Sequence, residues 1–267
     1  MEPSAHSRAE QVSANDAVVR SETKQRNRRP LRVSSIVLWF AGLALLLAAG
    51  FIVHNHPATW PLEQDAINAI QGPHPVPCPV NWHANLWENQ AAYFINTLND
   101  PIDAVVIPVG WMIIVMLLRM ILQALSLGIA VLTSSLWWLG IEILVERPRA
   151  TAQDGVCVHR AINAFSFPSG HVIHDVVLYG FLLYLSFSEP VRRWRYRWLL
   201  LPLQIAMVVY MLVVGYARLL AGEHHLFDVL GGYLAGLLWL FLCIFLYRWL
   251  ASLIKRRHLR KMSQANV

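Results

Sequence analysis

Charged residues are scarce in this sequence, and that scarcity limits its class more than any other property of its composition. Lysine, arginine, aspartate and glutamate make up 14% of the 267 residues, whereas 56% are hydrophobic. A soluble domain usually carries roughly 25% charged residues. The sequence also lacks zinc-type cysteine spacing, a glycine-rich nucleotide loop and internal repeats. These absences argue against a soluble enzyme, a zinc protein or a nucleotide-binding domain, and the long apolar runs favour a membrane protein.

The net charge of +6 does not indicate a nucleic-acid partner, because the basic residues cluster beside apolar segments. Clusters of this kind orient membrane proteins and contact anionic lipid headgroups. Residues 1–32 are polar and end in such a basic block, so we expect a disordered cytoplasmic tail. Residues 33–53 carry no charge over 21 positions, which suits a spanning helix better than a signal peptide with an apolar core of about 7–15 residues.

Five further spanning helices are expected within residues 102–250. Residues 54–101 before them are rich in proline, and we expect a long loop with short interfacial helices. The apolar stretch from Ala104 to Ile141 contains a single charge, Arg119. One helix of that length would reach roughly 57 Å, against a hydrocarbon core of about 30 Å, so we expect a hairpin that turns at Arg119. The remaining spans are predicted at His171–Phe187, Trp198–Ala217 and Leu226–Leu250.

The positive-inside rule predicts how these six spans are oriented. One side of the membrane receives the most basic segments: the N-terminal tail, the Arg119 turn, residues 189–197 and the basic tail 251–267. The other side receives the loops 54–101, 147–170 and 218–225. We therefore predict an all-α, polytopic helical bundle in the cell membrane, with both termini in the cytoplasm.

Three short polar groups interrupt the apolar chain, and all of them fall on the predicted extracytoplasmic side. They are Arg147-Pro148, then Pro168-Ser169-Gly170-His171, and then Arg218 with His224 and Asp228. Arginine forms charged, bidentate hydrogen bonds with phosphate, although it is also a common interfacial anchor, and we interpret Arg149 as such an anchor or as a solvated side chain. Gly170 permits a tight turn, and Ser169 with the free N–H groups of a helix start suits an anion as well as an ordinary helix cap.

The third polar group indicates histidine chemistry. His224 and Asp228 are four residues apart, so they share one face of a helix. A carboxylate can hold one imidazole nitrogen as N–H and leave the other as a nucleophile. His171 can donate a proton to a leaving group. The plain alternative is a set of polar residues at the membrane interface, but an acid so close to hydrocarbon usually has a partner and a function.

Taken together, these residues resemble the type 2 phosphatidic acid phosphatase family of membrane lipid phosphatases. The family pattern is K-x6-R-P, then P-S-G-H, then S-R-x5-H-x3-D. It matches Arg147-Pro148, Pro168 to His171, and the spacing of Arg218, His224 and Asp228, over about residues 100–250. Two positions differ, because Gly140 stands at the motif lysine and Ala217 at the motif serine. The closest charge to Gly140 is Glu142, whose sign is wrong for phosphate.

The resemblance implies a metal-free lipid phosphatase with no cofactor, acting on a phosphatidic acid-like phosphate or an isoprenoid diphosphate. It implies that His224 attacks phosphorus, Asp228 fixes the tautomer and His171 protonates the leaving group. The phosphoryl oxygens would be held by Arg147, Arg218, Ser169 and Gly170. A lipid phosphotransferase would use the same residues, and a lipid-binding or transport homologue without turnover is the alternative of another class.

Weaker expectations concern four other polar residues and a pair of cysteines. Asp175, with His174 beside it, can orient His171, and His225 can contact substrate or face water. Cys78 and Cys157 can pair if their compartment is oxidising.

Overall fold

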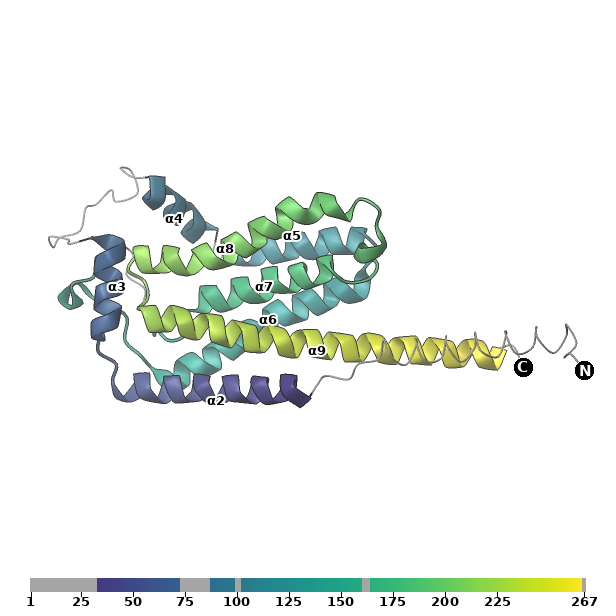
Figure 1. Cartoon of the computed structure of the whole chain (residues 1–267), viewed down its shortest axis with the longest axis horizontal. Helices are drawn as coiled ribbons and strands as arrows, with labels where there is room; N and C mark the ends of the chain where they lie inside the picture. The colour runs from purple at the N-terminus through teal and green to yellow at the C-terminus, as the bar shows by residue number, and fades with distance from the viewer. Residues whose placement is uncertain (1–32, 73–86, 99–101, 160–163, 266–267) are drawn as a thin grey trace, which may run out of the picture. The chain divides into compact units, whose positions relative to one another are not determined.

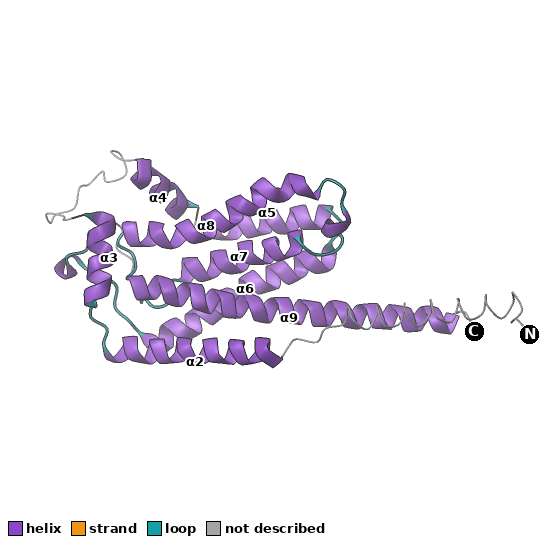
Figure 2. Ribbon diagram, viewed as in Figure 1, coloured by secondary structure: helices purple, strands orange, loops and turns teal. Residues whose placement is uncertain are grey.

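The computed structural model describes residues 33–72, 87–98, 102–159 and 164–265, and within these ranges it contains helices and no strands (Figures 1 and 2). The longer helices are α2 (Val33–Asn55), α3 (Pro61–Gln71), α4 (Trp87–Thr97), α5 (Asp103–Leu117), α6 (Ile121–Val145), α7 (Gly170–Ser186), α8 (Leu201–Leu220) and α9 (Leu226–Ala265). Three short 3-10 turns are η2 (Ala152–Asp154), η3 (Val191–Arg193) and η4 (Arg197–Leu200). The all-α expectation is confirmed. The chain divides into two compact units after Gly42, within α2. The contacts described below lie within the second unit, residues 43–267.

Six apolar helices correspond to the six expected spans, but they are not equally long. In the described part of the chain, four are long and apolar enough to cross a membrane: Val33–Asn55, Ile121–Val145, Arg197–Leu220 and Leu226–Arg257. The apolar helices Ala104–Leu117 and Gly170–Ser186 are shorter. The chain is thus a multi-pass membrane protein, although the count of six full-length spans is not reproduced.

The hairpin between α5 and α6 turns at Arg119, as the sequence predicts. Arg119 has a φ of 60°, in the left-handed region that a non-glycine residue seldom adopts. The N–H of Met120 bonds back to the carbonyl of Val115 at 3.1 Å, which closes the turn. The exposed Arg119 side chain explains why the helix stops here, since a cation at mid-bilayer would cost roughly 2.5–3.5 kcal/mol.

Helix α7 forms the centre of the bundle and packs against α6, α8 and α9 (Figure 1). Most of its residues are buried, in contrast to the lipid-type exposure of apolar side chains on α2, α5 and α6. Gly236 of α9 lets α7 approach closely, because a Cβ there would lie 3.0 Å from the Val176 Cβ. Helix α9 runs on from the predicted span end at Leu250 through most of the basic tail to Ala265. At the helix starts, the Ser169 N–H donates to the Asp228 carbonyl at 2.9 Å, which holds the beginning of α7 beside the first turn of α9.

The proline-rich segment does hold two short helices, α3 and α4, which pack against the end of the bundle. The Gln71 side chain at the end of α3 accepts a hydrogen bond from the Cys157 N–H at 3.0 Å and donates to the carbonyls of Cys157, Leu219 and Leu220. Cys157 is disulfide-bonded. Its expected partner, Cys78, lies outside the described residues. These links fix α3 over the C-terminal end of α8.

Candidate active site

His224 lies in the turn between α8 and α9 and is 1% exposed. Its Nδ1 lies 2.9 Å from the carbonyl oxygen of Ser166. Because a carbonyl only accepts, Nδ1 carries the proton and Nε2 keeps its lone pair. Burial, together with the charges of Arg149 and Arg218, lowers the pKa of His224 to about 3. The ring is therefore neutral near pH 7, and Nε2 carries the unprotonated lone pair that a nucleophile needs.

Asp228, in the first turn of α9, does not contact His224 as the sequence predicted. The Asp228 Oδ2 to His224 Nδ1 distance is 4.0 Å, which is too long for a hydrogen bond. Instead Oδ2 accepts from the hydroxyl of Ser166 and from the N–H and Nδ1 of His225, at 2.8 and 3.1 Å. Asp228 thus holds Ser166, and the Ser166 carbonyl holds His224. Ser166 was missed because a backbone acceptor leaves no sequence signature.

Arg147 is fully buried, and every one of its five N–H donors is occupied. Its Nη1 and Nη2 donate to the two carboxylate oxygens of Glu63 at 3.0 and 2.7 Å. Nη1 also donates to Asp228 at 2.8 Å. The carbonyls of Pro57 and Ala58 accept from Nε and Nη2 at 3.3 and 3.5 Å. No donor is left for a phosphate in this arrangement, so the expected phosphate contact is replaced by an ion-pair network that fastens α3 to α9.

Arg149, two residues further on, occupies the place expected of Arg147. Its Nη1 lies 3.5 Å from His224 Nε2 and donates to the Glu223 carbonyl at 2.7 Å. Its Nε donates to the carbonyl of Ala164 at 3.1 Å. Burial lowers its pKa, and its charge interacts with Glu223 and Asp228. The interpretation of Arg149 as an interfacial anchor is wrong. The K-x6-R-P pattern did not find it, because Ala150 follows Arg149 and the residue seven positions before Arg149 is Glu142 instead of lysine.

If Arg149 is the motif arginine, the motif lysine falls seven residues before it, at Glu142 and not at Gly140. Glu142 is buried, its carboxyl bonds to the backbone of Phe165, and its charge interacts with that of Arg149. Its Oε1 has no hydrogen-bond partner among the described residues. Gly140 lies about 200° away around the helix and borders a groove with α2 instead. Gly140 is therefore not the place of a lost phosphate contact.

Arg218 and Ser169 carry hydrogen-bond donors that have no acceptor among the described residues. Arg218 is fully buried at the end of α8, and its Nη1 pairs with Glu223 at 2.7 Å. Its Nε and Nη2 have no partner among the described residues, and neither does the buried hydroxyl of Ser169. Ser169 precedes α7 but makes no capping bond with its side chain. Leaving such groups unpaired is costly, so their arrangement indicates a site for an anion.

The Pro168-Ser169-Gly170-His171 segment sits where the prediction placed it, at the start of α7. A Cβ at Gly170 would lie 2.8 Å from Trp138, so the indole of α6 packs where any other residue would carry a side chain. His171 is half-buried, and the side chains that act on it electrostatically include Arg218, His224 and Arg149. These four side chains form one cluster at the end of the bundle.

The weaker expectations have mixed outcomes. Asp175 lies 3.5 Å from its neighbour His174. His225 is buried between Asp228 and the Thr59 hydroxyl, 3.1 Å from each, so it does not face water. Within the described ranges, no group of three or more histidine, cysteine or acidic side chains could hold a metal ion.

A buried neutral histidine, two arginines and unpaired donors at one end of a bundle of apolar helices form a site that can accept an anion. The PAP2 superfamily model matches residues 108–252, which is more than half of the chain. The chain therefore belongs to the PAP2 superfamily.

A solved structure supports the same fold. The chain is similar to the transmembrane PAP2-type phosphatidylglycerolphosphate phosphatase from Bacillus subtilis, with a TM-score of 0.55 and 21% sequence identity. The similarity covers 77% of this chain and 93% of the other.

Proposed function

We propose that this protein is a lipid phosphatase that works through a phosphohistidine intermediate on His224. Membership of the PAP2 superfamily supports a membrane phosphatase. The observation that carries the proposal is the set of buried donors without partners, the Arg218 Nε and Nη2 and the Ser169 hydroxyl, beside a neutral His224. An anion with several oxygens satisfies all of these donors at once.

In the first step, the lone pair of His224 Nε2 attacks phosphorus and forms a P–N bond while the P–O bond to the lipid breaks. His171, protonated when the negative phosphate lies beside it, gives its proton to the leaving oxygen, which departs as an alcohol or as a lipid phosphate. The Ser166 carbonyl holds the Nδ1 proton throughout, and Asp228 stabilises the positive charge that develops on the ring. Arg149, Arg218 and Ser169 bind the phosphoryl oxygens.

In the second step, water attacks the phosphohistidine and gives a proton to His171. The P–N bond breaks, its electron pair returns to Nε2, and inorganic phosphate leaves. This sequence requires no metal, because the arginines supply the positive charge. If a lipid hydroxyl replaced the water, the same residues would carry out phosphotransfer.

The substrate in this proposal is a lipid phosphate or diphosphate, reached from the extracytoplasmic face. The charge distribution of the sequence supports that face. The apolar helices around the site support a substrate whose chain stays in the bilayer. The name of the Bacillus subtilis protein adds phosphatidylglycerolphosphate to phosphatidic acid and isoprenoid diphosphate as candidates.

The test is phosphate release by purified protein from these three lipids and from water-soluble glycerol phosphate. Release from at least one lipid, far faster than from glycerol phosphate, is the expected result. Phosphate that appears on an added acceptor lipid, rather than in solution, would identify a phosphotransferase. No release and no transfer by a folded protein would contradict both enzymatic readings.

A further inference from the structure

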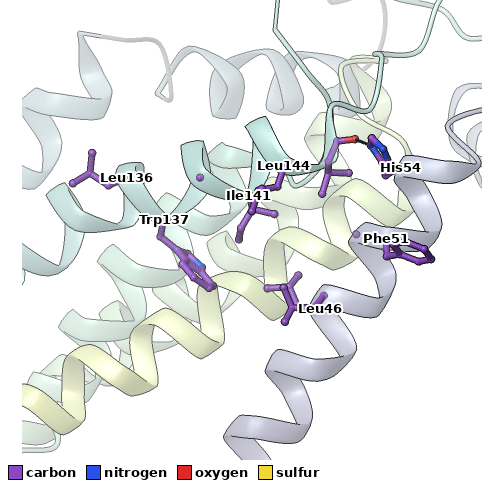
Figure 3. A pocket seen from close by; sticks show the side chains of 11 residues that line it. Leu46, Phe51, His54, Leu136, Trp137, Ile141 and Leu144 are labelled. Atoms are coloured by element: carbon purple, nitrogen blue, oxygen red, sulfur yellow. Dashed lines mark hydrogen bonds between the residues drawn. The ribbon is translucent and has the colours of Figure 1, made fainter.

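An apolar groove between α2 and α6 takes no part in the mechanism above. It has a volume of about 380 Å³, with one wall formed by α2 and the other by α6 (Figure 3). Large apolar side chains line most of it, among them Leu46, Phe51, Leu136, Trp137, Ile141 and Leu144. Both walls belong to candidate membrane spans. The material available at this depth is therefore hydrocarbon.

The two glycines shape the groove in different ways, because Gly140 borders open space and Gly50 lets α2 approach α6 closely. A Cβ added at Gly140 would meet no atom within 4 Å, so the space beside it is unfilled. On the facing wall, a Cβ at Gly50 would lie 3.0 Å from a methyl group of Val145. The lining spans nine residues of α2, from Leu46 to His54, which corresponds to a length of about 13 Å along the helix.

One end of the groove adjoins the candidate active site. His54 Nδ1 bonds to the carbonyl of Val145 at 3.0 Å, and these two residues lie at the end of the groove, where α2 and α6 end (Figure 3). The chain then continues from Val145 into the segment that carries Arg149. The Phe167 ring would lie 3.8 Å from a Cβ at Gly50, and Phe167 is flanked by Ser166 and Pro168 of the site. A single aromatic residue thus separates the groove from the segment that positions His224.

We infer that this groove takes the hydrocarbon chain of the lipid whose phosphate is cleaved, an inference that rests on the proposed function. The chain enters from the bilayer, lies along Gly140 and leads its phosphate past the His54 end towards His224. The groove then selects substrates by chain length and bulk. It also explains why glycine, rather than a bulky residue, suits position 140.

The kinetic test fills the groove by Gly140→Phe and compares it with Gly110→Phe. Gly110 of α5 is a matched control, because a Cβ there also meets no atom within 4 Å and the position lies outside the groove. We expect Gly140→Phe to lower kcat/KM for a long-chain lipid phosphate about ten-fold, the lower range for a misfit in an apolar pocket, and to leave a short water-soluble ester unchanged. Equal losses on both substrates, no loss on either, or the same loss in Gly110→Phe would overturn the inference.

A second measurement does not depend on turnover. A lipid phosphate with a photoreactive diazirine on its chain is expected to label residues 46–54 or 136–145 of the wild-type protein, and to lose this labelling in Gly140→Phe. Labelling elsewhere, or equal labelling by a phosphatidylcholine with the same diazirine chain, would show that the groove holds bulk lipid and would overturn the inference. Absence of phosphate release from every substrate would instead refute the proposed function, because selective labelling is scored without it.

Discussion

Arg147 and Arg149 flank one proline, yet they lie in opposite surroundings. Arg147 gives all five donors to Glu63, Asp228 and two carbonyls, in a network that ties α3 to α9. Arg149 lies beside the lone pair of His224, near Arg218, whose Nε and Nη2 have no partner in the described chain. A buried network in which every hydrogen-bonding group has a partner stabilises a structure, whereas buried donors without partners indicate a binding site. The comparison separates the residues that hold the site from those that act in it.

The largest effect is expected on the acting side of this comparison. His224→Ala should lower turnover by about 10³-fold or more, since the mutation removes the proposed nucleophile. His56→Ala is the control, because His56 is an exposed histidine that directly follows α2 and has no role in the proposed mechanism. Phosphate release and thermal stability in detergent are measured for both variants. Wild-type release by a folded His224→Ala protein would rule out the phosphohistidine intermediate.

Arg149→Ala is expected to lower kcat/KM about 10²-fold with little loss of stability. Removing one preorganised donor to a developing oxyanion usually costs 10²–10³-fold. The readout is phosphate release, together with the inhibition constant of inorganic phosphate, which should weaken. Full activity in this variant would indicate that Arg147, and not Arg149, binds the phosphate.

Arg147→Ala is expected to reduce stability first, by about 3–5 kcal/mol, because it leaves Glu63 and Asp228 as buried charges without their partner. Thermal unfolding in detergent measures this loss. Adding Glu63→Gln to the same variant should recover part of it, since one unpaired charge is removed. A stable Arg147→Ala protein with a raised KM would instead indicate a direct contact with phosphate.

The same two arginines show which features of the site could be predicted from the sequence and which could not. Apolar run lengths were enough to predict the helices and the turn at Arg119, because both follow from local composition and the thickness of a bilayer. The choice between Arg147 and Arg149 depended on their partners. Glu63 comes from a distant proline-rich segment, and a one-dimensional pattern does not show that it neutralises Arg147.

The missing lysine illustrates the same limit at the scale of one helix turn. Gly140 and Glu142 are two residues apart, so they lie about 200° apart around α6. Gly140 therefore borders the groove, whereas Glu142 lies on the side of Arg149. The Ser166 carbonyl that orients His224 is a backbone group, which no residue type identifies. Residues proposed to act through their side chains, such as His171, His224 and Arg218, were predictable as candidates.

Glu142→Gln is expected to have a moderate effect. The buried carboxylate lowers the positive potential around Arg149, so its removal should tighten inhibition by inorganic phosphate about five-fold, equivalent to about 1 kcal/mol. Glu142→Asp, which keeps the charge, is the control. Unchanged inhibition in Glu142→Gln would mean that the carboxyl is neutral in the resting protein.

The smallest effect is expected from metal removal. Excess EDTA should leave phosphate release unchanged, because Arg149 and Arg218 already place two guanidinium groups beside His224 that can bind the phosphoryl oxygens. Adding Mg²⁺ or Zn²⁺ to the chelated protein is the control. A loss of activity that either ion restores would mean that the arginines alone do not neutralise the transition state, and it would replace the metal-free mechanism. The same titration on Arg149→Ala sharpens the comparison, since a site that depends on arginine should stay impaired whether or not a metal ion is supplied.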